Sequence, residues 1–169
     1  GGRSLMFNGH MDTMPAEAAL WSQDPLTPVV RDGRLYGLGV CDMKSGLAAA
    51  AMAVRLVRDA GLALPGDVII CSVADEEGGG NGSIAAAMQG ERADGVVVCE
   101  GTNYELVAAH MGFVFFRVEV EGLAVHSGIK WKGVSAIHKA MRLMSALDEL
   151  EHMWLMRYKH PLLPAPNLN

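Results

Sequence analysis

The sequence lacks the features that mark nucleic-acid-binding and membrane proteins. Its formal net charge is −5 and it has no run or stripe of lysine and arginine, so we expect no nucleic-acid surface. A small anionic substrate is compatible with that charge. The chain contains no apolar span of about 18 residues and no signal peptide, so we expect no membrane association.

Cysteine is also scarce. The three cysteines (Cys41, Cys71 and Cys99) are an odd number without a C-x-x-C pair, and two of them lie inside the apolar runs VIICSV and VVVCE. This pattern is typical of free, mostly buried thiols in a reducing compartment. We therefore expect a cytoplasmic protein.

The sequence does not begin with methionine, it opens inside a strand-like segment, and it stops abruptly at PAPNLN. We therefore expect it to be a piece of a longer protein. Its 169 residues, of which 50% are hydrophobic, suffice for one or two globular domains with a hydrophobic core.

Residues 1–108 show the pattern of an α/β domain. Short runs rich in valine and isoleucine recur, which favours buried strands of a mainly parallel sheet. These runs are SLMF (4–7), DVIICSVA (67–74) and GVVVCE (95–100). Helical patterns lie at 43–60 and 83–90, and residues 29–37 form a predicted hairpin with Asp32-Gly33 as its turn. This alternation predicts a three-layer α/β domain.

From residue 109 onward the pattern changes. The stretch GFVFFRVEVEG at 112–122 alternates with a period of two from Phe116 onward, as in a half-buried antiparallel strand. A long helix is predicted at about 133–157 from apolar residues at helical spacing. We therefore predict a second, smaller α+β domain over residues 109–169.

Unusual polar residues follow the predicted strands or open the first helix. They are His10, Asp12, Asp42, Asp75, Glu76, Glu77 and Glu100. Residues i and i+2 of an extended chain point to the same side, so His10 and Asp12 face a common space. Ligands of open α/β sheets bind at the carboxyl ends of the strands, so these segments are expected to form one site.

That many carboxylates repel one another unless a cation lies among them. Histidine, aspartate and glutamate ligands suit zinc, with cobalt or manganese as alternatives. Two metal ions suit the number of acids better than one, and a carboxylate bridging two metals about 3.5–4 Å apart is a known hydrolytic arrangement. The sequence therefore predicts a site for divalent metal ions.

Taken singly, these residues have simpler explanations. His10 alone is typical of a core or loop histidine, and Asp42 alone could cap the helix that follows it. The stretch DEEGGGNGS alone is typical of a solvated turn, and GLG is a weak phosphate-loop signal. Cys41 lacks the Cys-His-Asn order of a thiol nucleophile. The combination of these stretches points to a common site.

Together, these stretches resemble the dinuclear zinc amidohydrolase family, which holds acetylornithine deacetylase, succinyl-diaminopimelate desuccinylase, aminoacylase and related carboxypeptidases. The matching stretches occur in the family's order over nearly the whole chain. They are NGHMDTMP, DGRLYGLGVCDMKSG, VADEEGGGNGS, VVVCEGT and VEVEGLAVHSG. The resemblance implies a zinc-exopeptidase-like catalytic domain in residues 1–108 and a partial ferredoxin-like lid or dimerisation domain in residues 109–169.

The resemblance also implies a set of metal ligands. His10 and Glu100 hold one metal ion, and Glu77 holds the second. Asp42 bridges the two, and the Asp42–Met43 peptide bond is expected to be cis.

Three catalytic roles follow from the same resemblance. Asp12 holds the ring of His10. Glu76 is the general base, which takes a proton from the attacking water and passes one to the leaving amine. His126, in VHSG, polarises the substrate carbonyl. In dimeric family members this histidine reaches the partner subunit's site, so we expect a homodimer formed through the lid domain.

The activity implied by the resemblance is metal-dependent hydrolysis of the amide bond of an N-acyl amino acid or similar amine. Glu100 favours deacylation, because family peptidases often have aspartate at this place. A di- or exopeptidase of the same family and a non-catalytic binding protein on the same fold are the alternatives. The family's second metal also uses a histidine that would lie beyond residue 169, so this chain alone is expected to hydrolyse poorly or not at all.

Overall fold

The computed structural model describes residues 1–168 and falls into two compact units. The first unit spans Gly1–Glu105, and the second begins at Leu106. The boundary expected from the sequence, between residues 108 and 109, lies slightly further along the chain. No helix among residues 1–168 has the length and apolar character needed to cross a bilayer.

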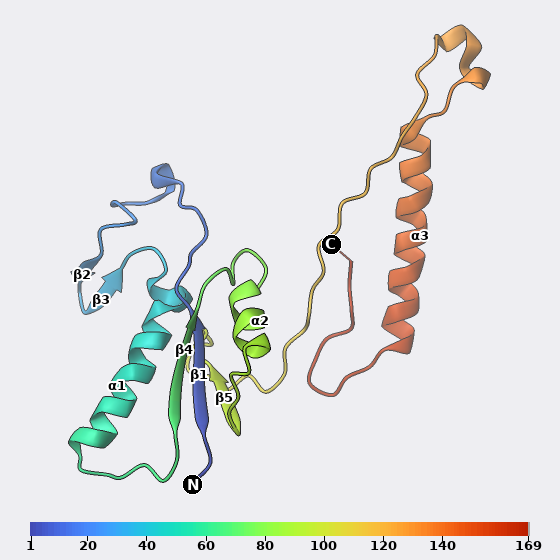
Figure 1. The fold of residues 1–169 in the computed structure, drawn as a ribbon. Helices are drawn as coiled ribbons and strands as arrows, with labels where there is room; N and C mark the ends of the chain where they lie inside the picture. The colour runs from blue at the N-terminus through green and yellow to red at the C-terminus, as the bar shows by residue number, and fades with distance from the viewer. Residues whose placement is uncertain (169) are drawn as a thin grey trace. The chain divides into compact units, whose positions relative to one another are not determined.

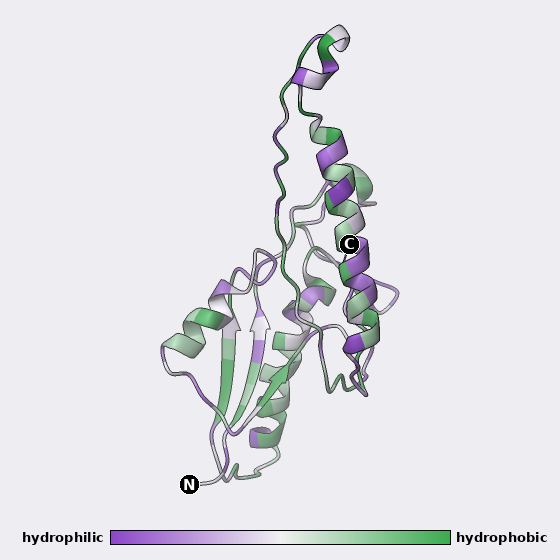
Figure 2. Cartoon of the chain, turned by 90° about the vertical axis from the view of Figure 1, so that its right-hand side faces the viewer, coloured by the Kyte–Doolittle hydropathy of each residue, from purple (hydrophilic) through white to green (hydrophobic). Residues whose placement is uncertain are grey.

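The first unit is built around a parallel sheet of three strands in the order β4-β1-β5 (Figure 1). β1 (Leu5–His10) lies between β4 (Val68–Val73) and β5 (Gly95–Val98), and both neighbours pair with it in parallel. The three predicted apolar runs form these three strands, which are largely hydrophobic (Figure 2). The carboxyl ends of the strands therefore meet at one edge of the sheet.

α1 (Ser45–Asp59) covers one face of this sheet. Gly9 points toward this face, because a Cβ added to Gly9 would lie 2.9 Å from the side chain of Leu47. The buried Ala50 lies on the same helix. Gly61, with φ of +72°, follows the helix end as the sequence predicts, because glycine adopts the left-handed conformation that terminates many helices.

α2 (Asn81–Met88) covers the opposite face of the sheet. A Cβ on Gly82 would lie 3.0 Å from the Cβ of Val73, so α2 contacts the face to which Val73 points. The residue before Val73 is Ser72, which pairs with Gly9 and points to the same face as Gly9. Successive residues of a strand point to opposite faces, so α1 and α2 flank the sheet. The three-layer arrangement predicted for the first domain is therefore present in this unit (Figure 1).

β2 (Val29–Arg31) and β3 (Arg34–Tyr36) form the predicted antiparallel hairpin. Its two turn residues, Asp32 and Gly33, have φ angles of +52° and +72°. Positive φ at both positions is what a two-residue type I′ turn requires. A short 3₁₀ helix, η1 (Ala18–Leu20), precedes the hairpin.

Ser4 and Asp94 join the starts of β1 and β5. The Asp94 carboxylate accepts the backbone N–H of Ser4 at 2.7 Å and its hydroxyl at 3.0 Å. These two hydrogen bonds hold the pKa of Asp94 below its ordinary value. A carboxyl group whose pKa is lowered by folding stabilises the fold above its unfolded pKa, and this stabilisation is lost as the pH falls through the folded value.

Asp94→Asn is therefore expected to lower the free energy of unfolding near neutral pH. The difference from wild type should shrink as the pH falls into the acid range. Urea unfolding of wild type and variant, in the whole protein, measures this between about pH 7 and pH 2. A stability difference that stays constant over this range would contradict the assignment.

The second unit contains one long helix and little buried core. α3 (Ala136–Arg157) begins after Ser135, whose hydroxyl accepts the N–H of His138 at 3.2 Å. The predicted long helix is confirmed, with its start moved to the serine cap. None of its residues is buried, and the methionines at 141 and 144 are 61% and 57% exposed.

The strand predicted at 112–122 is wrong for the described chain. Within residues 106–168 this segment pairs with no other strand, and one isolated antiparallel bridge follows it, between Leu123 and Val134. The alternating pattern is present, but a strand forms only where a second strand accepts its backbone hydrogen bonds. Phe116 is accordingly 63% exposed.

Candidate metal centre

His10 is the last residue of the central strand, and it is only 1% exposed. Its Nε2 lies 2.9 Å from Oδ1 of Asp42. Its Nδ1 lies 3.0 Å from the backbone carbonyl oxygen of Asp12 and 3.3 Å from the Asp12 carboxylate. Because a carbonyl oxygen only accepts, Nδ1 carries a proton and Nε2 faces the carboxylates, which is the orientation of a metal-ligating histidine.

Asp42 reaches His10 from a short irregular helical turn, η2 (Val40–Lys44), which leads into α1. The Asp42–Met43 peptide bond is cis, as the resemblance implied. Met43 is buried against Gly9, while the Asp42 side chain is 65% exposed. The buried methionine therefore anchors the turn and leaves the carboxylate free to face His10.

Glu76 and Glu77 follow β4 on a turn that Asp12 holds. The Asp12 carboxylate accepts the backbone N–H of Glu76 at 3.4 Å and that of Glu77 at 3.2 Å. Burial raises the pKa of Asp12, but these backbone hydrogen bonds and the charge of His10 outweigh it and lower that pKa. Asp12 thus contacts both the histidine and the two glutamates, a second link that the sequence did not reveal.

The two glutamate side chains have different neighbours. Glu76 Oε2 lies 3.7 Å from Nε2 of His10. Glu77 Oε1 accepts the backbone N–H of Met14 at 3.2 Å. Asp75, the third acid of this turn, instead accepts a hydrogen bond from Asn81 at the start of α2.

Glu100 follows β5 and places Oε1 3.6 Å from Nε2 of His10. Burial raises the pKa of Glu100, and the negative charges of Asp42 and Glu76 raise it further, although His10 opposes them. Three strand ends and the η2 turn therefore bring their acidic side chains around one buried imidazole.

The donor atoms form two overlapping groups that are close enough to hold a metal ion. The groups are His10, Asp42 and Glu77, and His10, Glu76 and Glu100, with the atoms of each group within 4.8 Å of one another. These five residues are called the His10 cluster. By distance alone, Glu76 falls among the donors, whereas the resemblance gives it the role of base.

The chemistry of the His10 cluster fits a divalent cation. Burial lowers the pKa of His10, but the hydrogen bond to Asp42, the Asp12 carbonyl and the charges of nearby glutamates outweigh it and raise that pKa. Among residues 1–168, no lysine or arginine forms an ion pair with the four carboxylates of the cluster. Imidazole nitrogen with carboxylate oxygens is a donor set that suits zinc, cobalt or manganese.

Gly46 sets how closely α1 approaches the end of β5. A Cβ on Gly46 would overlap the carbonyl oxygen of Cys99 and lie 2.8 Å from its Cβ. We expect Gly46→Ala to force these backbones apart and to destabilise the fold by about 1–3 kcal/mol. We also expect weaker metal binding, because Asp42 and Glu100 lie on the two displaced segments. Gly112→Ala is the matched control, because nothing lies within 4 Å of its added Cβ.

Denaturant unfolding and metal titration of the whole protein measure both effects of Gly46→Ala. Equal stability and metal affinity in the two alanine variants would show that this close approach does not shape the site.

His126, the remaining predicted site residue, belongs to the second unit. It precedes the short helix η3 (Ser127–Lys132), and its Nδ1 accepts the backbone N–H of Gly128 at 3.0 Å. The structure therefore brings together His10, Asp12, Asp42, Glu76, Glu77 and Glu100 within the first unit.

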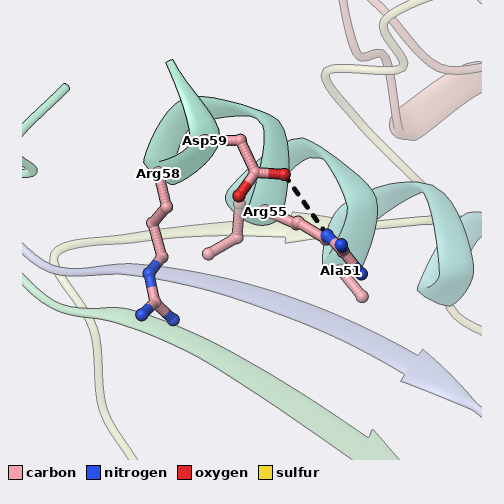
Figure 3. Close-up of a pocket in the computed structure, with 5 residues that line it drawn as sticks. Ala51, Arg55, Arg58 and Asp59 are labelled. Carbon is pink, nitrogen blue, oxygen red and sulfur yellow. Dashed lines mark hydrogen bonds and ion pairs between the residues drawn. The ribbon is translucent and has the colours of Figure 1, made fainter. Parts of the chain in front are cut away.

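A surface hollow on α1 contains none of the predicted site residues (Figure 3). It is lined by Ala51, Val54, Arg55, Arg58 and Asp59, toward the end of the helix far from Asp42. Arg55 and Asp59 form an ion pair of 3.3 Å with side chains 72% and 62% exposed, so this is an ordinary solvated helix face.

Comparison with known proteins gives consistent matches. The model of the peptidase family M20/M25/M40 matches residues 6–163. An N-formyl-4-amino-5-aminomethyl-2-methylpyrimidine deformylase of Bacillus subtilis (strain 168) is 32% identical over 169 residues, covering 94% of this chain and 39% of the relative. An acetylornithine deacetylase of Proteus mirabilis (strain HI4320) is 33% identical over 172 residues, covering 100% of this chain and 44% of the relative.

Among solved structures, human carnosine dipeptidase 1 is similar with a TM-score of 0.50 and 28% identity, over 57% of this chain and 22% of that one. The chain thus spans about two fifths of the length of the curated relatives described above.

Proposed function

The chain belongs to the peptidase family M20/M25/M40, and on this basis we propose that the whole protein is a metal-dependent hydrolase of amide bonds. Its substrate is an N-acyl amino acid or a similar N-acylated amine. The products are the carboxylate of the acyl group and the free amine.

One observation carries this proposal. The fully buried imidazole of His10 has carboxylate oxygens of Asp42, Glu100 and Glu76 at 2.9, 3.6 and 3.7 Å from its Nε2. Several carboxylates around a buried histidine, without lysine or arginine partners in residues 1–168, are typical of a cation site.

We propose that His10, Asp42, Glu77 and Glu100 hold two divalent metal ions, with zinc as the metal and cobalt or manganese as alternatives. Such ions supply Lewis acidity and lower the pKa of bound water to about 7. His10 and Glu100 serve one ion, Glu77 serves the other, and Asp42 serves both.

The chain's own residues then supply the proton transfers. Glu76 takes a proton from the attacking water and delivers one to the leaving amine nitrogen. Asp12 keeps the His10 ring and the Glu76–Glu77 turn in place through the hydrogen bonds described above. His126 donates a hydrogen bond to the substrate carbonyl oxygen, on which negative charge develops.

The second unit is proposed to be part of a lid and dimerisation domain, through which two copies form a homodimer. The protein is proposed to act in the cytoplasm. These assignments rest on membership of the family and on the sequence stretch around His126. The 169-residue chain made by itself is expected to hydrolyse slowly or not at all.

Two observations favour deacylation. The similar deformylase and deacetylase are both named for removing an acyl group from nitrogen. The resemblance of the sequence to the family adds that glutamate stands at position 100, a place where family peptidases often have aspartate. The second candidate function is dipeptide hydrolysis, which the similarity to carnosine dipeptidase supports.

A panel of substrates separates these two functions. Purified whole protein loaded with Zn²⁺ or Co²⁺ is assayed against N-formyl, N-acetyl and N-succinyl amino acids and against dipeptides. Turnover of N-acyl amino acids well above that of dipeptides is expected. The reverse preference would favour the dipeptidase, and no turnover of any member would favour a non-catalytic binding protein on this fold.

A further inference from the structure

We propose that Gly128 is a positioning residue that sets the tautomer of His126. Its backbone N–H keeps Nδ1 of the ring unprotonated, so the neutral imidazole carries its proton on Nε2. This inference rests on the proposed function, in which His126 donates a hydrogen bond to the substrate carbonyl. It adds which ring nitrogen donates and which group makes it do so.

The hydrogen bond between the two residues fixes the direction of donation. The N–H of Gly128 lies 3.0 Å from Nδ1 of His126. A backbone N–H only donates, so Nδ1 must offer a lone pair. In a neutral imidazole one nitrogen carries the proton and the other accepts, so the proton lies on Nε2. A doubly protonated ring would lose this hydrogen bond.

Glycine at position 128 lets the ring lie against the backbone. A Cβ on residue 128 would lie 3.2 Å from Nδ1 and 3.5 Å from Cε1 of His126. The distance to Nδ1 is tighter than most Cβ contacts and the distance to Cε1 is an ordinary van der Waals contact, so a side chain at position 128 would have little room beside the ring.

The loop that carries both residues is closed at its base. Leu123 and Val134 exchange two backbone hydrogen bonds, of 2.8 and 3.0 Å. Inside the loop, Ile129 donates its N–H to the carbonyl oxygen of His126 at 2.9 Å. The backbone of residue 128 is therefore fixed relative to that of residue 126, which lets the N–H act as a lasting constraint on the ring.

The tautomer matters because the two forms offer opposite groups at Nε2. With the proton on Nε2, the ring donates to a carbonyl oxygen and the bond strengthens as negative charge develops there. With the proton on Nδ1, Nε2 presents a lone pair that repels the same oxygen. A neutral donor also works at a pH where the imidazolium form is not populated.

Nitrogen NMR tests the proton position directly. In the whole protein labelled with ¹⁵N-histidine, long-range ¹H–¹⁵N correlations of the neutral ring distinguish the two tautomers, and His126→Gln identifies the signals. We expect a protonated Nε2 and an unprotonated Nδ1 for His126. A protonated Nδ1, or a fast exchange between both tautomers, would overturn the proposal.

Two proline variants test the source of the effect. Gly128→Pro removes the N–H that bonds to the ring. Ser127→Pro removes the neighbouring N–H and suits the first residue of η3, because residue 126 is already extended with φ of −59° and ψ of 140°. We expect Gly128→Pro to lose the single tautomer of His126 and to lower kcat by about 3- to 10-fold, with KM and metal content unchanged. We expect Ser127→Pro to keep the single tautomer and the kcat of the wild type.

If Gly128→Pro does not fold, Gly128→Ala is measured in its place. This variant retains the backbone N–H of residue 128, so it should retain the proton on Nε2 of His126. An unchanged spectrum and kcat in folded Gly128→Pro would contradict the role of this N–H. Full activity of His126→Ala would instead contradict the role of His126 in the proposed function, while the spectrum of the wild type still decides the tautomer by itself.

Discussion

Replacing Glu76 with alanine is expected to lower kcat by at least about 100-fold, the usual contribution of a general acid–base group, while metal content stays nearly unchanged. Glu76 Oε2 lies 3.7 Å from the buried Nε2 of His10, and its side chain is 47% exposed. It is therefore close to the donor atoms and still open to water and substrate.

Metal should persist in this variant because the four proposed ligands are left unchanged; they are His10, Asp42, Glu77 and Glu100. Asp75→Asn is the matched control on the same turn. Asp75 has a φ of +65°, which asparagine tolerates, and its carboxylate contacts Asn81 outside the His10 cluster. The control removes one negative charge and should keep most of the activity.

Steady-state kinetics and metal analysis of the two variants decide this prediction. If Glu76→Ala keeps its kcat, another group is the base. If instead it loses its metal, Glu76 acts as a ligand, as the grouping with His10 and Glu100 by distance would allow.

Replacing His10 with alanine is expected to have the second large effect, loss of both metal and activity. His10 belongs to both donor groups and is the one nitrogen donor in either. Changes to residues that merely orient metal ligands typically lower affinity by about 10- to 100-fold, so loss of the ligand itself should exceed this range.

The same change leaves four carboxylates without their histidine neighbour, so part of its effect is on folding. His10→Gln keeps a polar side chain in the buried position and separates the two effects. His152→Ala is the surface control, because His152 is exposed on α3 and its Nδ1 bonds to the Asp148 carbonyl within its own helix. Metal titration and unfolding of these variants are the measurements, and wild-type metal affinity in His10→Gln would contradict the site.

Elements that are marked by a local sequence pattern could be predicted from the sequence. The apolar runs that became β1, β4 and β5, the hairpin at Asp32-Gly33 and the helix that ends before Gly61 each carry their own signal. The grouping of His10 with later acids could also be predicted, because parallel strands end at one edge of a sheet.

Single residues were ambiguous in the sequence because each fits two roles. Asp42 does not cap α1 in the structure, since the helix has Lys44 before it and no side-chain cap, and its carboxylate bonds to His10 instead. In the acidic turn after β4, Asp75 serves the local structure, because its carboxylate accepts a hydrogen bond from Asn81 outside the His10 cluster.

Features that depend on distant contacts could not be read from the sequence. The segment 112–122 has the alternation of a strand, but pairing is a property of two segments, and none pairs with it in the described unit. The close contact of Gly46 with Cys99 and the bond from Gly128 to His126 likewise have no pattern of their own.

The metal content of the purified whole protein tests the central claim most directly. We expect close to two divalent ions per chain by elemental analysis. Chelation should remove them together with hydrolysis of N-acyl amino acids, and added Zn²⁺ or Co²⁺ should restore it. Full activity in a preparation with almost no metal would contradict the account of the His10 cluster.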